Sequence, residues 1–161
     1  VDAVIEANDR RKLAMAPIVV EAAGGSVAGK TIAVLGLTFK PNTDDMREAP
    51  SLAIVPALQA AGATVRAFDP EGMHEAGKHL ADVEYASGPY ECLEGADLAV
   101  IITEWDQFRA LDLGRVAGLL GDRLLIDLRN IYGAEDAAKA GLTYRSIGRP
   151  ASQAPKTPLP A

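Results

Sequence analysis

The sequence predicts an α/β fold: a three-layer, Rossmann-like, doubly wound and mostly parallel sheet, preceded by a long N-terminal helix. From Lys30 onward, short apolar runs alternate with helical segments. Two of these runs, at 32–35 and 98–102, are continuously apolar, as expected for strands that helices cover on both faces. The chain has 161 residues, 48% hydrophobic and 24% charged, which suits one domain with one sizeable core.

The N-terminal segment, residues 1–23, mixes apolar positions with a charged run that ends at Lys12. This pattern predicts an amphipathic helix that ends at the Gly24-Gly25 pair and is kinked by Pro17. The sequence begins at Val1 in the middle of this pattern, with no helix cap before its first apolar residue. We therefore expect the chain to be part of a longer protein.

The strands and the remaining helices follow from the apolar runs and from the Gly and Pro positions between them. A helix is expected at 50–61, because it starts with Pro50 and stops at Gly62, and this asymmetry is typical of helices. Pro56 should loosen one turn of it. The strands are expected at 31–37, 64–69, 83–86, 97–102, 123–128 and 143–147, and further crossover helices at 89–95, 105–120 and 134–140. The Pro-rich residues 149–161 are expected to be a disordered tail.

Charge and cysteine content exclude several classes of partner. The net charge of −6 and the pI near 4.9 argue against nucleic acid and anionic membranes, since both need clustered Lys and Arg. The single Cys92 cannot form an internal disulfide, and no apolar run resembles a signal or membrane span. We expect a soluble, cytoplasmic protein. A small nucleotide stays possible, because one diphosphate needs only one or two cations.

The loop after the first strand does not fit a dinucleotide fingerprint. That fingerprint needs three glycines for the close approach of a pyrophosphate, and residues 34–45, VLGLTFKPNTDD, contain only Gly36. Asp69, after the second strand, occupies the usual place of the ribose-binding acid. We interpret the Asp69-Pro70 pair as a turn device instead.

Cations take the place of the missing glycines. Phe39 and Lys40 follow the first strand directly, and Arg47 precedes the helix at 50–61. The carboxyl edge of an open α/β sheet is where ligands bind, and Lys or Arg suits phosphate oxygens. The residues alone also allow a second interpretation, in which the acidic residues of 44–48 pair with Lys40 and Arg47 on a solvated loop.

Residues 36–51, GLTFKPNTDDMREAPS, resemble the start of the C-terminal domain in the UDP-glucose/GDP-mannose dehydrogenase family. The segments at 57–70, 96–108 and 126–132 follow in that family's order and spacing, so the resemblance spans residues 1 to about 148. Residues 42–47 and 126–132 look most like the UDP-glucose 6-dehydrogenase branch. The alternatives are the GDP-mannose and UDP-N-acetylmannosamine branches, or a non-catalytic nucleotide-binding module.

The resemblance implies part of an NAD-dependent oxidoreductase that oxidises UDP-glucose in two steps to UDP-glucuronate, a precursor for polysaccharide biosynthesis. Residues 1–24 would then be the C-terminal end of a central dimerisation helix, and residues 25–148 the UDP-sugar-binding domain. UDP-glucose, a second copy in a homodimer and an N-terminal NAD-binding domain are the implied partners. NAD would be bound mainly by that N-terminal domain.

The same resemblance implies roles for four residues. Phe39 and Lys40 match the pair that contacts the nucleotide sugar, and Arg129 matches the arginine that binds the UDP end of the substrate. Arg47 matches the arginine that reaches the NAD held by the other domain. The segment Thr103-Glu104-Trp105 and Tyr132 are weaker candidates. Because large aromatic side chains commonly supply packing area, we interpret Trp105 and Tyr132 as core residues.

No catalytic residue is expected in this chain. The nucleophile of the family lies in a Gly-Gly-Ser-Cys-Phe-type segment that these residues do not contain. We interpret Cys92 as a small buried hydrophobe, and we expect the chain by itself to have no dehydrogenase activity. His74 and His79 lack regularly spaced Cys or His partners, so we expect surface residues and no metal.

Overall fold

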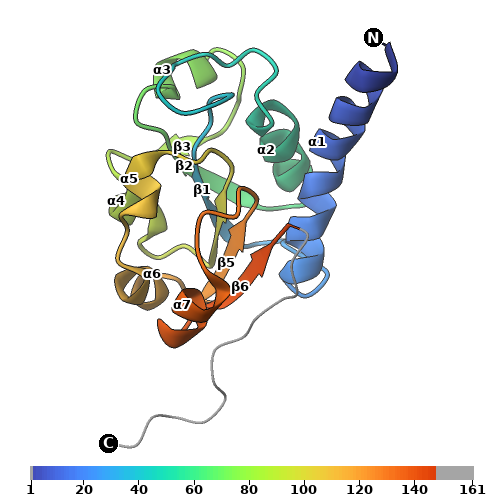
Figure 1. The fold of residues 1–161 in the computed structure, drawn as a ribbon. Helices are drawn as coiled ribbons and strands as arrows, with labels where there is room; N and C mark the ends of the chain where they lie inside the picture. Colours follow the sequence, from blue (N-terminus) through green and yellow to red (C-terminus); the bar gives the residue numbers. More distant parts are fainter. Residues whose placement is uncertain (1, 148–161) are drawn as a thin grey trace, which may run out of the picture.

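The computed structural model describes residues 2–147, which form one six-stranded sheet with helices on both faces (Figure 1). The strands are β1 (Thr31–Leu35), β2 (Thr64–Phe68), β3 (Glu84–Tyr85), β4 (Leu98–Ile101), β5 (Leu124–Asp127) and β6 (Thr143–Ser146). The helices are α1 (Asp2–Ala22), α2 (Ser51–Ala60), α3 (Met73–Ala76), α4 (Pro89–Leu93), α5 (Asp106–Arg109), α6 (Leu113–Leu119) and α7 (Ala134–Lys139).

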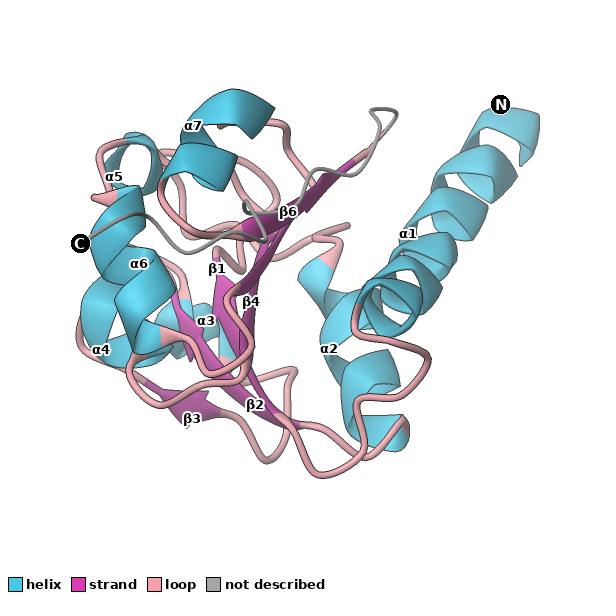
Figure 2. Cartoon of the chain, turned by 90° about the horizontal axis from the view of Figure 1, so that it is seen from below, coloured by secondary structure: helices cyan, strands magenta, loops and turns pink. Residues whose placement is uncertain are grey.

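The strand order is β3-β2-β1-β4-β5-β6, and every pair of neighbours is parallel. This is the order of a doubly wound Rossmann-like sheet, in which the winding reverses between β1 and β4. Helices α1 and α2 cover one face, and α4, α5, α6 and α7 cover the other (Figure 2). The predicted fold class is confirmed, long N-terminal helix included.

The central strands explain the continuous apolar runs of the sequence. Successive side chains of a strand point to opposite faces, so Ile32 and Val34 enter the core cluster beneath α1 and α2, whereas Ala33 and Leu35 enter the cluster beneath the other helices. All four are at most 1% exposed. A strand covered on both faces cannot alternate apolar with polar residues.

The six predicted strands are all present, but the helices differ from the prediction in two places. The expected helix at 105–120 is two short helices, α5 and α6, and the second has its own N-cap: the Asp112 carboxylate accepts a hydrogen bond from the Arg115 amide, 3.2 Å away. Helix α3 was not predicted, since it lies in a polar stretch with no apolar period. The predicted tail at 149–161 lies outside the described residues.

Helix α1 runs from Asp2 to Ala22 with Pro17 inside it, and Gly24 and Gly25, both at positive φ, follow its end. Its inner face packs against α2 and buries Met15, Ala16 and Val19 in the core. The N-terminal part of α1 extends past α2, toward the same end of the molecule as α3 and the loop after β1 (Figure 1). Among the described helices, none combines the length and apolarity needed to cross a bilayer.

A buried carboxylate organises the carboxyl edge of the sheet. Asp69, directly after β2, is fully buried. One of its oxygens accepts hydrogen bonds from the amides of Leu37 and Thr38 at 2.7 and 3.1 Å and from the Trp105 indole at 3.2 Å. The other accepts from the amides of Glu71 and Gly72 at 2.9 and 2.7 Å. Asp69 is therefore a turn device, as the sequence interpretation held, and it joins three loops.

Contacts with the loop after β4 and with the start of α2 also fix the loop that follows β1. Gly36 has φ +92°, and a Cβ built on it would lie 2.6 Å from the Thr103 backbone nitrogen, so only glycine allows β1 and β4 to approach this closely. The Thr103 hydroxyl donates to the Thr38 carbonyl at 2.8 Å, and the Ser51 hydroxyl donates to the Leu37 carbonyl at 2.6 Å.

We predict that Asp69→Asn destabilises the protein strongly, although the two side chains have nearly the same shape. Both Asp69 oxygens accept hydrogen bonds, so the amide NH₂ of asparagine must face donors in either orientation. Leaving buried donors without an acceptor should lower the free energy of unfolding by about 2–4 kcal/mol. Urea unfolding followed by circular dichroism measures this loss.

Asp97→Asn is the matched control. Among the described residues, the Asp97 side chain accepts through one oxygen only, from the Thr31 amide at 2.8 Å, and the carbonyl of asparagine can replace that bond. Its loss should stay below about 1 kcal/mol. Equal losses in the two variants would contradict the role given to Asp69.

Candidate functional site

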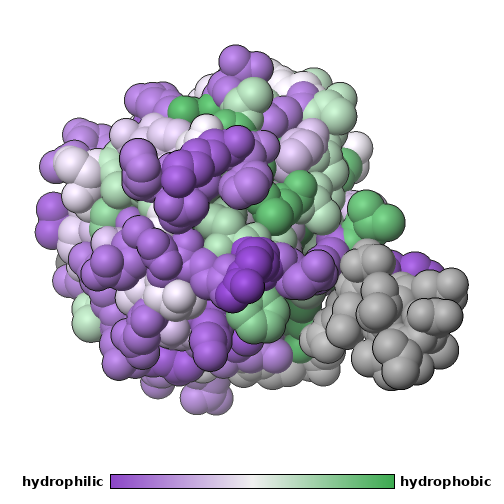
Figure 3. Space-filling view, turned by 90° about the horizontal axis from the view of Figure 1, so that it is seen from above, coloured by the Kyte–Doolittle hydropathy of each residue, from purple (hydrophilic) through white to green (hydrophobic). Residues whose placement is uncertain are grey.

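A hollow of about 450 Å³ opens at the carboxyl edge of the sheet, next to α1. It draws on four parts of the fold: α1, the loop after β1, the start of α2 and the loop after β5. Figure 3 looks onto this side of the molecule, where hydrophilic residues dominate and apolar residues form separate small patches. The lining residues are Lys12, Met15, Phe39, Lys40, Glu48, Pro50 and Arg129.

Phe39 and Lys40 are presented by a loop whose backbone closes on itself. The Phe39 amide donates to the Asp45 carbonyl at 2.9 Å, and the Thr38 hydroxyl donates to the Lys40 carbonyl at 3.0 Å. Asn42, at φ +65°, makes the turn between them. Both residues nevertheless stay exposed, and Phe39 is 49% accessible. A fixed backbone thus carries an aromatic ring and an ammonium that are open to a ligand.

Arg129 is placed by a second buried carboxylate. Asp127, the last residue of β5, accepts from the amides of Arg129, Ile131 and Tyr132 at 3.0, 2.8 and 3.1 Å and from the Tyr144 hydroxyl at 2.7 Å. The loop after β5 is therefore folded back over the strand end. This turn directs the Arg129 side chain toward the hollow that Lys40 also lines.

Both ends of the Arg129 segment have further anchors. The Arg129 guanidinium forms an ion pair with Glu104, which follows β4. Asn130, at φ +56°, pairs its side-chain amide with the backbone of Ile147 through two hydrogen bonds of 3.1 Å. These contacts hold the arginine in one orientation without burying it, since its side chain is 40% exposed.

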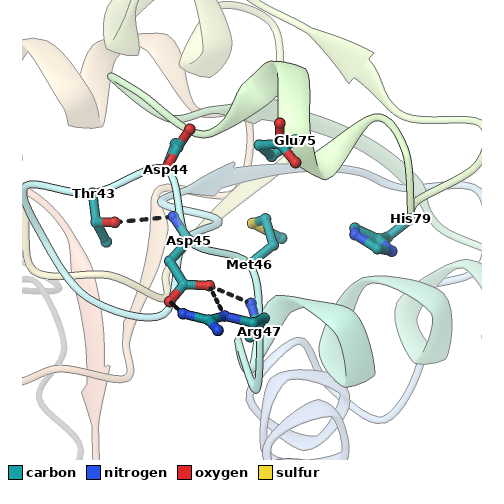
Figure 4. Close-up of a pocket in the computed structure, with 7 residues that line it drawn as sticks. All are labelled: Thr43, Asp44, Asp45, Met46, Arg47, Glu75 and His79. Carbon is teal, nitrogen blue, oxygen red and sulfur yellow. Dashed lines mark hydrogen bonds and ion pairs between the residues drawn. The ribbon is translucent and has the colours of Figure 1, made fainter.

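Arg47 lies in a different hollow, of about 390 Å³ (Figure 4). Its guanidinium donates to both oxygens of Asp45 at 3.0 and 3.1 Å, and its amide donates to the same carboxylate at 2.9 Å. The hydrogen bond from Arg47 lowers the pKa of Asp45, and Asp45 raises that of Arg47. His79 and Glu75 line the other side. The structure thus brings Phe39, Lys40 and Arg129 together in one hollow and places Arg47 in another.

The sequence left two interpretations of the loop after β1 open: a ligand-binding loop, or a solvated loop whose acidic residues pair with Lys40 and Arg47. The structure agrees with part of each. Arg47 pairs with Asp45, as the solvated-loop interpretation holds. Lys40 instead lines the hollow with Arg129. The side chain of Arg47 remains 89% exposed despite its partner, so the ion pair leaves the guanidinium accessible.

The weaker candidates are core residues. Trp105 and Tyr132 are 7% and 9% exposed. The polar group of each is hydrogen-bonded within the protein: the Trp105 indole donates to Asp69, and the Tyr132 hydroxyl donates to the Phe108 carbonyl. Burial raises the pKa of Tyr132. The interpretation of both as packing residues agrees with these contacts. Thr103 is buried as well, in its bond to Thr38.

Cys92 and the two histidines lie away from the hollow. Cys92 is a buried residue of α4, and this burial raises the pKa of its thiol to about 12. His74 and His79 are exposed. Within residues 2–147, no group of three or more His, Cys, Asp or Glu side chains is arranged to hold a metal ion.

Sequence reasoning missed Lys12 and the partners of two acidic residues around the hollow. Lys12 and Glu48 line it and form an ion pair of 3.0 Å, and Glu104 pairs with Arg129. Lys12 carried a signal: it lies three and four residues before Met15 and Ala16, on the buried face of α1. A charged residue on the apolar face of a helix is unusual, and it indicates that the side chain has a specific partner. Glu48 was expected to pair with Lys40 or Arg47 and pairs with Lys12 instead, and Glu104 belonged to a weaker candidate segment whose pairing with Arg129 was not predicted.

A family model described as the UDP binding domain of the UDP-glucose/GDP-mannose dehydrogenase family matches residues 33–134. This stretch runs from the middle of β1 to the first residue of α7, and it includes the loops that carry Phe39, Lys40 and Arg129. The chain belongs to this family. Within the UDP-glucose/GDP-mannose dehydrogenases, it matches the domain named for binding UDP.

Relatives within the family share most of the chain. It is 54% identical over 150 residues to a UDP-glucose 6-dehydrogenase of Rhizobium meliloti, covering 93% of this chain and 34% of that protein. It is 43% identical over 152 residues to UDP-glucose 6-dehydrogenase TuaD of Bacillus subtilis, covering 94% and 33%. The chain thus spans about a third of the length of the curated relatives it matches.

A solved structure of a UDP-glucose dehydrogenase has a similar fold over most of this chain. A UDP-glucose dehydrogenase from the hyperthermophilic archaeon Pyrobaculum islandicum superposes with a TM-score of 0.68 at 30% sequence identity. The match covers 84% of this chain and 29% of that one. The likeness supports the parallel sheet and its helices as the family's C-terminal domain.

We predict that Cys92 is unreactive in the folded protein. With a pKa of about 12, only about one thiol in ten thousand is ionised near pH 8, and only the thiolate attacks a disulfide reagent. Ellman's reagent should detect no thiol in the native chain and one thiol per chain in denaturing guanidinium chloride. Rapid reaction of the native chain would contradict the buried, non-catalytic assignment.

Proposed function

We propose that this chain is the UDP-sugar-binding domain of an NAD-dependent UDP-glucose 6-dehydrogenase, which oxidises UDP-glucose to UDP-glucuronate in two steps. One observation carries the proposal: Lys40 and Arg129, 89 positions apart in the sequence, line one hollow at the carboxyl edge of the sheet. The relatives that share this domain, at 54% and 43% identity, bear the name of that enzyme.

Each lining residue has a role in this proposal. The Lys40 ammonium and the planar Arg129 guanidinium bind the oxygens of the UDP diphosphate, where charge-assisted hydrogen bonds are strong. The exposed Phe39 ring offers apolar surface to the nucleotide sugar. The anchored backbone of both loops keeps these groups in place before the ligand arrives, which lowers the entropy lost on binding.

NAD, when bound, accepts the hydride in this chemistry, and the residues present fit only a peripheral contact with it. The loop after β1 has Phe39 and Lys40 where a dinucleotide site needs glycines. The side chain of Arg47 is 89% exposed and lines a separate hollow from the one that holds Lys40 and Arg129. We assign the main NAD site to an N-terminal domain and a cofactor contact to Arg47. The nucleophile belongs upstream of this domain, since the one cysteine here, Cys92, is buried.

The remaining assignments complete the proposal. Helix α1 is the end of a central helix through which two copies form a homodimer, and residues 25–148 form the substrate domain. The enzyme works in the cytoplasm and supplies UDP-glucuronate to polysaccharide biosynthesis.

We predict that Arg129→Ala weakens binding of UDP-glucose by about one to two decades, because it removes a charged hydrogen bond worth about 1.5–3 kcal/mol. NAD binding should hardly change. Calorimetry and the Michaelis constants of the intact enzyme measure both, and UDP should compete with UDP-glucose more strongly than GDP does.

Arg123→Ala is the control for this variant, since Arg123 precedes β5 and Arg129 follows it. It should bind UDP-glucose as the unmodified enzyme does. An unchanged Michaelis constant for UDP-glucose in Arg129→Ala, or stronger competition by GDP than by UDP, would argue against the proposed function.

We predict the opposite pattern for Arg47→Ala: a Michaelis constant for NAD raised about tenfold or more, with UDP-glucose binding retained. Arg109→Ala is its control, because Arg109 is also an exposed arginine with an acidic neighbour, 3.9 Å away. A selective loss of UDP-glucose binding in Arg47→Ala would show that the cofactor role is wrong.

A further inference from the structure

A lysine interrupts the apolar face of α1 at the point where that helix reaches the hollow. Met15, Ala16 and Val19 are buried against the domain, and Lys12 lies three, four and seven positions before them. Residues at these spacings share one helical face. Lys12 therefore points to the side of α1 that faces the domain, and it lines the hollow with Lys40 and Arg129.

The partner of Lys12 is much more open to solvent than Lys12 itself. The Lys12 ammonium lies 3.0 Å from the Glu48 carboxylate, and their side chains are 18% and 76% exposed. An ion pair with so exposed a member contributes little stability, because solvent screens it. A phosphate, with more charge and more acceptor oxygens than a carboxylate, can take the place of Glu48 at the ammonium.

Positive charge is concentrated around the hollow in a protein that is acidic overall. Three of its seven lining residues are cations and one is a carboxylate, whereas the whole chain carries a net charge of −6. Two phosphate groups offer acceptors for more than two cations. Lys40 and Arg129 approach from loops of the sheet, and Lys12 approaches from α1.

We propose that Lys12 is a third phosphate-binding cation of this site and that it exchanges Glu48 for the diphosphate of the nucleotide sugar when the ligand binds. The proposal rests on the proposed function, because it concerns the same hollow. Helix α1 then contributes directly to substrate binding as well as to the core.

The test is calorimetric titration of the 161-residue chain with UDP. Lys12→Met should weaken UDP binding about ten- to hundredfold, since it removes a charged hydrogen bond, and Lys12→Arg should retain most of the affinity. Glu48→Gln removes the competing carboxylate, so it should bind UDP as tightly as the unmodified chain or more tightly. A loss in Lys12→Met with no loss in Glu48→Gln distinguishes ligand binding from a merely structural ion pair.

Lys30→Met is the matched control. Lys30 also pairs with a carboxylate, that of Asp122 at 2.6 Å, but it precedes β1, at the edge of the sheet away from the hollow. Its UDP affinity should be unchanged, and thermal unfolding of each variant verifies the fold.

Two results would overturn the role of Lys12 while the unmodified chain still binds UDP. One is unchanged affinity in Lys12→Met, and the other is an equal loss in Lys12→Met and Glu48→Gln, which means that the pair only holds the loop. Absence of UDP binding by the unmodified chain would instead count against the proposed function as well.

Discussion

Two buried carboxylates hold the carboxyl edge of the sheet, and the site depends on them. Asp69 follows β2 and Asp127 ends β5, on either side of the central pair β1 and β4. Loops that leave a sheet at a buried edge carry amides without strand partners, and a buried amide needs an acceptor. Each aspartate accepts several such amides through both oxygens. No neutral side chain of that size accepts hydrogen bonds in this way.

This anchoring allows a rigid backbone to carry exposed side chains. Lys40 lies two residues after Thr38, which bonds to Asp69, and Arg129 lies two residues after Asp127. The anchored residues are in the core, whereas Lys40 and Arg129 reach the surface. A binding group fixed by its backbone loses less entropy when the ligand arrives. The stability of the loops and the proposed binding of the nucleotide thus have the same physical origin.

Three cationic side chains near the carboxyl edge of the sheet pair with carboxylates, and these carboxylates differ in how exposed they are to solvent. Arg129 pairs with Glu104, which is 22% exposed, whereas Arg47 and Lys12 pair with Asp45 and Glu48, at 30% and 76%. A partner that remains in solvent is easily replaced, and one that is packed keeps the orientation of its cation. This grading is consistent with Arg129 as a fixed part of the site and Lys12 as the part that changes partner.

The sequence by itself determined the strands, the helix at 50–61 and the location of Cys92, because apolar runs, Pro and Gly act over a few neighbouring residues. Only the tertiary structure decided the break between α5 and α6, the short helix α3 and the ion pairs of the hollow. Lys12 meets Glu48 across 36 positions, and Arg129 meets Glu104 across 25. Such contacts exist only once α1 docks on α2 and the parallel strands align their carboxyl ends. Local propensity carries no information about that docking.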